Sequence, residues 1–255
     1  MDNIKQLLDN EVTNRNNSNE ISEAKPDPLL IAKQNNSEYI ALICALFAYG
    51  NVHQIIKFLH SLDFKMIENS EENIKVFFNK YYYRFQKADD IIALFIALKR
   101  LKEKTTLENI FLEGYQKKQC VLEGIDKIIQ SVREVYEYNS EGYKFLVGTP
   151  FKRDKLGDIK HIGNSPYKRY NMFLRWMVRS DNLDMGLWKQ VDKKHLILPL
   201  DTHTFNVSLK LGLLQRKTYD LKSAILITNK LQEFDPEDPI RYDFALYRIG
   251  QEKII

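Results

Sequence analysis

The sequence is poor in the residues that make turns and crosslinks. It has ten glycines and seven prolines in 255 residues, below the roughly 12% that soluble proteins use. An all-β sandwich or barrel needs a turn after each short strand, so this scarcity argues against both folds. The two cysteines, Cys44 and Cys120, are too few for a disulfide framework, a zinc ribbon or a four-cysteine iron–sulfur cluster.

Long apolar runs are also missing. The longest uncharged run, residues 39–56, is polar in its second half, so its apolar part is shorter than the roughly 20 residues that cross a bilayer. The first residues, MDNIKQLLDNEVTNRNN, lack the apolar core of a signal peptide. The sequence has no Walker-type or Rossmann-type glycine pattern, and its five histidines have no metal-ligand spacing. We therefore expect a cytoplasmic protein with no membrane segment, metal or cofactor.

Helical periodicity is what the sequence has in abundance. Apolar residues recur at spacings of three and four nearly throughout, and no strand-like run is present, so an all-α protein is predicted. After a short N-terminal helix, helices are expected over 37–62 with a break at Gly50–Asn51, and over 70–84, 88–102, 105–116, 120–138, 167–179, 202–211, 219–234 and 239–249. The breaker-rich residues 139–166 are interpreted as a long connection.

Two helix starts near the C-terminus are well specified. Asp238 precedes Pro239, the pattern of a capping residue before a proline in the first turn, and Gly250 is expected to end that helix. Asp201 follows a buried-looking apolar segment and is expected to cap a helix that ends at Gly212.

The positive charge of the chain lies in one segment. Residues 151–180 hold eight Lys or Arg and two Asp, a net charge of +6 in a chain whose formal net charge is +4. Clustered basic residues suit a polyanion, because its phosphates release counterions when Lys and Arg bind them. A solvated basic face with no partner would give the same pattern.

The predicted helix 167–179 has two distinct faces. Phe173, Trp176 and Met177 share one face and are expected in the core. A second face carries the polar residues Lys168, Asn171, Arg175 and Arg179, which could lie along a phosphate backbone. Lys168 is at the start of this helix beside Arg169, where its neutral amine could act as a nucleophile. A plain surface lysine is the alternative.

Asp201 also has two interpretations. As a helix cap it needs no catalytic role. Its apolar surroundings would equally let its carboxylate stabilise a nearby cation.

Several segments resemble known families. LPLDTHTFNVSLKLGLL and SPYKRYNMFLRWMVR resemble the segments that carry the catalytic aspartate and lysine of helix-hairpin-helix DNA glycosylases. Over nearly its whole length the chain resembles a bacterial family of uncharacterised proteins (a domain of unknown function), distantly related to the endonuclease III and archaeal oxidised-guanine glycosylase type. The segments that carry this resemblance are PDPLLIA, ALICALFAYGN, YYYRF, KRYNMFLRWMVR, LDTHTF and FDPEDPIRYDFALYRIG.

The resemblance implies a fold and an activity. Residues 1–25 would form an N-terminal helix and polar linker, and residues 26–255 a single two-lobed helical domain with its hairpin region at about 157–180. Lys168 and Asp201 would be catalytic and would converge on one solvent-reachable cleft. The protein would be a monomer that acts on double-stranded DNA and flips a damaged base, such as an oxidised purine, into a pocket.

The same resemblance implies contacts to DNA. Asn51 would fill the gap left by the flipped base, although it could equally be a plain turn residue. His203 would help to orient Asp201 or only satisfy the helix start, and we count it with Asn51 among the DNA-binding candidates. The remaining candidates for phosphate contacts are Arg169, Arg175 and Arg179.

The sequence departs from the glycosylase pattern at the hairpin. Residues 161–167 contain one glycine and one proline in place of a G-x-G turn, and the C-terminal iron–sulfur cysteines of endonuclease III are absent. Two alternatives to a glycosylase therefore stay open. One is a non-catalytic nucleic-acid-binding protein on the same scaffold, and the other is a helical enzyme or scaffold that acts on a small molecule.

Overall fold

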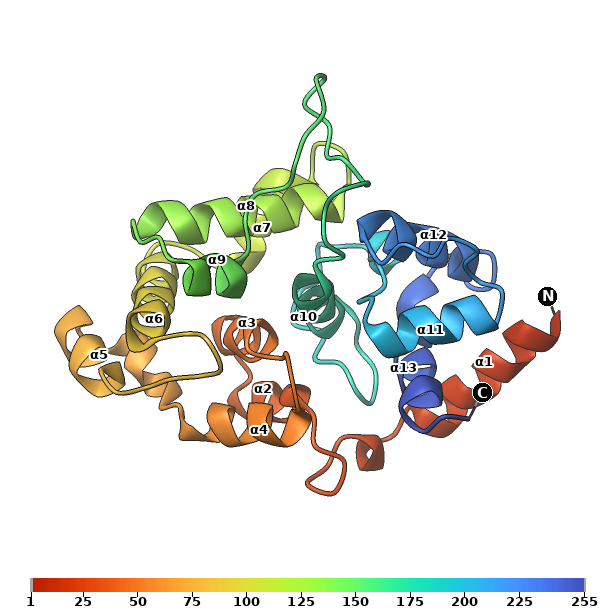
Figure 1. The fold of residues 1–255 in the computed structure, drawn as a ribbon, viewed down its shortest axis with the longest axis horizontal. Coiled ribbons are helices and arrows are strands. Elements are labelled where there is room, and N and C mark those ends of the chain that lie inside the picture. Colours follow the sequence, from red (N-terminus) through yellow and green to blue (C-terminus); the bar gives the residue numbers. More distant parts are fainter. Residues whose placement is uncertain (1, 255) are drawn as a thin grey trace. The chain divides into compact units, whose positions relative to one another are not determined.

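A computed structural model describes residues 2–254 as thirteen α-helices and four 3₁₀ helices (Figure 1). The described residues contain no strand and only two isolated β-bridges. The prediction of an all-α protein is therefore confirmed. No helix within this range is long and apolar enough to cross a membrane.

The chain divides into two compact units. Unit 2 is continuous and comprises residues 26–151, whereas unit 1 is assembled from residues 2–25 and 152–254. The N-terminal helix is thus part of a folded unit, where the sequence analysis expected only a helix and linker before the main domain.

Unit 2 is built around helix α6. Its members are α2 (Pro28–Asn35), α3 (Glu38–Leu46), α4 (Val52–Ser61), η2 (Phe64–Glu68), α5 (Glu71–Phe78), α6 (Ala88–Lys102), α7 (Leu107–Tyr115), α8 (Val121–Val135) and α9 (Glu141–Val147). Helix α6 contacts α5, α8 and α9. Its residues 91–98 are all buried, which explains why this helix has no polar face along that stretch.

Unit 1 brings together both ends of the described chain. Its members are α1 (Asp2–Arg15), η1 (Ser18–Glu20), α10 (Lys168–Val178), η3 (Lys193–His195), α11 (Thr202–Lys210), α12 (Leu221–Gln232), η4 (Pro239–Tyr242) and α13 (Asp243–Gln251). Helix α13 packs closely on α11, since a Cβ on Gly250 would lie 3.0 Å from side-chain atoms of His203 and Val207. The hydroxyl of Tyr242 donates to Asp9 over 2.9 Å and ties α1 to the same unit.

Side-chain caps account for most of the helix starts. Asp27, Asn51 and Asp201 each accept a backbone N–H of the following first turn, at the beginnings of α2, α4 and α11. The predicted break at Gly50–Asn51 is confirmed, because Gly50 has a φ of +102° and the next helix begins at Val52.

Three local expectations were wrong. Residues 139–166 are not one irregular connection, because Ser140 caps the helix α9 by accepting the N–H of Tyr143. Asp238 makes no side-chain cap bond at η4, because its carboxylate instead accepts a hydrogen bond from the guanidinium of Arg179. Gly250 does not end the last helix, which continues to Gln251.

Candidate active site

Lys168 is the first residue of helix α10. Tyr167 precedes it in the left-handed conformation, with φ 47° and ψ 40°, and makes no side-chain cap bond. The side-chain amide of Asn171 donates to the carbonyl of Pro166 over 2.9 Å, and Asn171 is buried. This bond holds the sharp entry into the helix and so positions Lys168 in its first turn.

Asp201 is held by the N-terminus of helix α11. Its Oδ1 accepts the backbone N–H of Thr204 over 2.8 Å, as a helix cap does. The preceding residues Leu198 and Leu200 are fully buried, so the backbone that carries Asp201 is anchored in the core. The second carboxylate oxygen, Oδ2, is therefore available for another partner at a fixed position.

That partner is Lys168. Its Nζ lies 3.5 Å from Asp201 Oδ2, and the lysine side chain is 32% exposed while the aspartate side chain is 14% exposed. The two side chains therefore lie together and solvent reaches both, whereas the predicted cleft and their catalytic roles stay predictions. A largely shielded carboxylate beside an accessible amine can stabilise a cation and exchange a proton with the amine.

Two further ionisable groups surround this pair. Tyr219 donates its hydroxyl to the carbonyl of Leu200 over 2.7 Å. Burial raises the pKa of Tyr219 to about 12, and the negative charge of Asp201 adds to this effect. Burial also raises the pKa of Asp243 to about 6; Arg175 opposes this rise, whereas Asp201 reinforces it. Asp243 is therefore a buried acid that is electrostatically coupled to the candidate pair.

The prediction that Arg175 and Arg179 form an exposed basic face on α10 is wrong. Arg175 and Arg179 are buried, at 5% and 7% exposure. Arg175 bridges two carboxylates, with Nη1 2.6 Å from Asp243 and Nε 3.2 Å from Asp184. Arg179 binds Asp184 as well, and its other contacts are 3.0 Å to Asp181 and 3.0 Å to Asp238. Because both guanidiniums are enclosed by carboxylates, they are not available to DNA phosphates.

The remaining candidates are Arg169 and His203 in unit 1 and Asn51 in unit 2. Arg169 is half-buried beside Lys168, and its predicted phosphate contact stays a prediction. His203 is exposed on α11, with its ring 6.0 Å from that of Tyr247. Asn51 belongs to unit 2, where its side chain caps α4 by accepting the N–H of His53 over 3.0 Å. This contact accounts for Asn51 as a helix-capping turn residue, and the wedge role stays a prediction.

The raised pKa of Asp243 predicts a pH-dependent stability. In the unfolded chain an aspartate has a pKa near 3.8, so the folded protein binds this proton more tightly. The stabilisation is complete below pH 4 and is lost as the pH rises through 6. We expect the unfolding free energy of Asp243→Asn, taken relative to that of the wild type, to increase by about 2.5 kcal/mol between pH 4 and 7. Urea titrations at each pH measure this difference, and a constant difference would contradict it.

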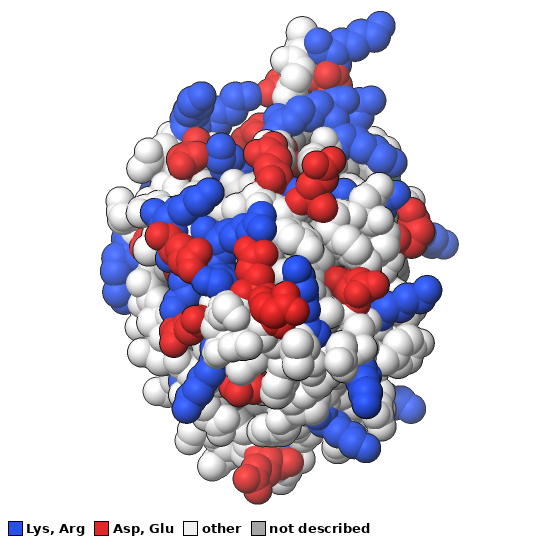
Figure 2. Space-filling view, turned by 90° about the vertical axis from the view of Figure 1, so that its left-hand side faces the viewer, with Lys and Arg blue, Asp and Glu red and all other residues white. Residues whose placement is uncertain are grey.

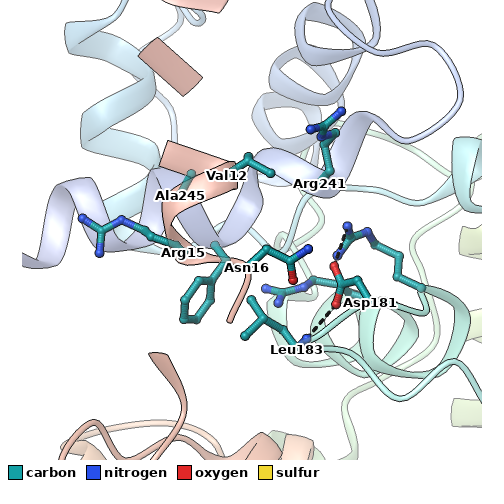
Figure 3. A pocket seen from close by; sticks show the side chains of 10 residues that line it. Val12, Arg15, Asn16, Asp181, Leu183, Arg241 and Ala245 are labelled. Atoms are coloured by element: carbon teal, nitrogen blue, oxygen red, sulfur yellow. Dashed lines mark hydrogen bonds and ion pairs between the residues drawn. The ribbon is translucent and has the colours of Figure 1, made fainter. Parts of the chain in front are cut away.

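A small pocket lies elsewhere in unit 1 (Figure 3). It is lined by Val12, Arg15, Asn16, Arg175, Arg179, Asp181, Leu183, Arg241, Phe244 and Ala245. Its volume of about 10 Å³ is room for about one water molecule. In Figure 3 the carboxylate of Asp181 accepts the backbone N–H of Leu183, over 2.8 Å. Neither Lys168 nor Asp201 lines this pocket, which is far too small for a nucleobase.

The sequence analysis missed Asp243 and Tyr219 as neighbours of the site. Asp243 follows its partner Arg175 by 68 residues, and no spacing rule connects them. One signal was present, since Asp243 lies within the quoted segment FDPEDPIRYDFALYRIG, where it is an acidic residue among apolar ones. An acid in such a position is buried only if it is paired, so a buried basic partner could have been inferred.

The sequence was compared with family models and curated proteins, and the chain with solved structures. No curated protein and no solved structure matched it. Within residues 2–254, no three His, Cys, Asp or Glu side chains are grouped so that they could hold a metal ion. One family model matches residues 27–252, nearly the whole chain, and on this match the chain belongs to the family described as "Protein of unknown function (DUF2400)".

Proposed function

We propose that this protein is a DNA base-excision glycosylase with lyase activity, which acts on a damaged base flipped out of duplex DNA. The observation that supports the proposal is the pairing of Lys168 Nζ with Asp201 Oδ2 at 3.5 Å, with the amine exposed to solvent. The two sequence segments that resemble glycosylase motifs are the ones that supply this lysine and this aspartate. An amine and a carboxylate at this distance are the groups that imine-forming base excision requires.

The chemistry assigns one role to each side chain. The lone pair of the neutral Lys168 amine forms a bond to C1′ of the flipped nucleotide as the glycosidic C–N bond breaks. The base leaves with that bonding pair and takes up a proton. The sugar ring then opens as O4′ takes a proton and leaves C1′, which yields a protonated imine on Lys168. Removal of a C2′ proton from the imine expels the 3′ phosphate and cleaves the strand.

Asp201 would act before and during bond formation. Its carboxylate can accept the proton that Lys168 must lose, and it stabilises the positive charge that develops on the sugar as the base departs. The burial of this carboxylate strengthens the second effect, because the charge–charge interaction is screened less than in water. The cap bond from Thr204 holds the carboxylate in position throughout.

Borohydride trapping tests the proposal directly. Sodium borohydride reduces the imine to a stable amine, so wild-type protein mixed with a duplex containing 8-oxoguanine or an abasic site is expected to give a covalent complex. Lys168→Arg keeps a positive charge beside Asp201 but cannot form this imine, so it is expected to give none. Lys217→Ala, which removes an exposed lysine of the same unit, is the control and is expected to trap normally.

Two results would contradict the proposal. The first is the absence of a covalent complex with every lesion-bearing duplex. The second is equal trapping by the wild type and Lys168→Arg, which would assign the imine to another amine. Salt-sensitive duplex binding without any trapping would instead favour a non-catalytic nucleic-acid-binding protein.

A further inference from the structure

Residues 152–160 form a hairpin in the part of the chain that connects α9 to α10, and this hairpin is seen as a projecting loop in Figure 1. Its two arms are joined by backbone bonds of 2.9 Å, from the N–H of Asp154 to Asp158 and from the N–H of Lys160 to Lys152. Gly157 closes the turn with a φ of +85°. The carboxylate of Asp154 accepts the N–H groups of Leu156 and Asp158 across the turn. The hairpin therefore has a defined conformation of its own, of the kind in which a three-residue loop ends in a left-handed glycine.

The base of this hairpin is clamped to unit 1 by Asn164, which is buried. Its side-chain amide donates to the carbonyl of Lys160 over 2.7 Å and to that of Lys152 over 3.2 Å. Its side-chain oxygen accepts the N–H of Lys152 over 3.1 Å. Its own carbonyl accepts the N–H of Leu221 at the start of α12. The clamp thus joins both arms to a packed helix and gives the hairpin a fixed base.

The hairpin carries the accessible positive charge of the basic segment. Arg175 and Arg179 are neutralised by buried carboxylates, as described above. The lysines at 152, 155 and 160 are exposed, and no carboxylate among residues 2–254 pairs with them. Figure 2 shows Lys and Arg side chains gathered on this projecting loop. The accessible positive charge of the basic segment 151–180 is thus on the hairpin lysines and not on the arginines of α10.

The tip of the hairpin is apolar. Leu156 is 88% exposed and is the most exposed large hydrophobic side chain among the described residues. An isolated leucine between lysines buries too little apolar surface to anchor a protein to a membrane. The same side chain on a rigid base is suited to a DNA groove, where single apolar residues pack against or between base pairs.

We propose that the hairpin 152–160 is a duplex-DNA contact, in which its three lysines bind phosphates on both sides of a groove and Leu156 enters that groove. This inference rests on the proposed function for the identity of the polyanion. It adds a docking element outside the quoted motif segments, none of which contains residues 152–160, and only residues 157–160 overlap the hairpin region expected at about 157–180.

Fluorescence anisotropy with an undamaged 20-base-pair duplex at several salt concentrations tests the lysines. The triple variant with Gln at 152, 155 and 160 is expected to bind at least about tenfold more weakly than wild type at low salt. Its slope of log affinity against log salt should be smaller by about 2.7, because each lost phosphate contact removes about 0.9. The matched control replaces the exposed lysines 75, 104 and 117 of unit 2 by Gln, and it is expected to keep the wild-type slope.

Leu156→Ala tests the apolar tip. Because Leu156 lies outside the core, its melting temperature is expected to match the wild type. Its affinity for the duplex should fall about three- to tenfold with an unchanged salt slope, since no charge is lost. A 2-aminopurine probe in the duplex should show less unstacking than with the wild type.

Three outcomes would overturn this inference. They are equal weakening by both lysine triples, an unchanged affinity for Leu156→Ala, and hairpin-dependent binding to phosphatidylserine vesicles without binding to the duplex. Because the duplex is undamaged, the binding assay does not depend on whether the protein excises bases. If the duplex binds through the hairpin but no covalent complex forms with borohydride, only the proposed glycosylase activity is contradicted. If a covalent complex forms but binding does not depend on the hairpin, only the hairpin contact is contradicted.

Discussion

Asp201→Asn is expected to reduce base excision by at least about a hundredfold while the protein stays folded. An asparagine Oδ1 can still accept the N–H of Thr204, so the cap of α11 is retained. The group that faces Lys168 across 3.5 Å becomes a neutral amide. The amide can neither accept the lysine proton nor stabilise the charge that develops on the sugar. Single-turnover release of 8-oxoguanine measures the activity, and urea unfolding measures the stability.

Further variants at Asp201 separate its two roles. Asp201→Ser should also keep the cap and lose the activity, whereas Asp201→Ala should lose both and cost about 0.5–2 kcal/mol of stability. Asp27→Ala is the matched control, because Asp27 caps α2 through the N–H of Leu29. It should cost a similar stability without affecting excision. Full activity in Asp201→Ser would show that this residue is a cap alone.

Arg175→Ala is expected to lower the unfolding free energy by about 3–5 kcal/mol. The substitution removes the group that bridges Asp184 and Asp243, both of which are buried. Asp243 then remains in the interior of unit 1 without its cation, and Asp184 keeps only Arg179. Urea unfolding of the full chain measures the loss.

Two comparisons identify the cause of that loss. Arg100→Ala removes a pair with Glu71 that is about one-third exposed, with N–O distances of 2.6 and 3.0 Å, and should cost about 1 kcal/mol. Adding Asp243→Asn to Arg175→Met should recover much of the stability, because the buried carboxylate left without its cation is removed. If Arg175→Ala were as stable as the wild type and only bound DNA more weakly, Arg175 would be a surface phosphate contact after all.

Local sequence signals predicted the helices well. Helix α6 spans the predicted range 88–102, and the capping residue Asp201 marked the start of α11. Helix α2, which Asp27 caps, was not predicted. The signals failed where a residue typical of turns or helix caps had a different role in the structure. Gly148 ends α9, a helix that was not predicted because its segment is rich in glycine and proline. Asp238 was expected to cap a helix, but its carboxylate binds Arg179 instead.

The candidate site was predictable only in part. The resemblance named Lys168 and Asp201, and the structure brings them within 3.5 Å. The periodicity of α10 correctly put Arg175 and Arg179 on one face, but periodicity does not say what covers a face. Two of the covering carboxylates, Asp238 and Asp243, lie 59 and 68 residues after the arginines that they bind, and their approach depends on the tertiary packing of η4 and α13.

The interrupted connectivity of unit 1 has a consequence for synthesis of the chain on the ribosome. Helix α1 is translated before unit 2, yet Tyr242 and Glu252, to which it is bonded, lie 233 and 237 residues downstream of their partners in α1. Unit 2 is continuous and is fully synthesised long before those residues emerge, so it can fold while α1 is still undocked. The nascent protein therefore carries the apolar face of α1, which includes the buried Leu8, without its partners until residues 239–252 have been translated.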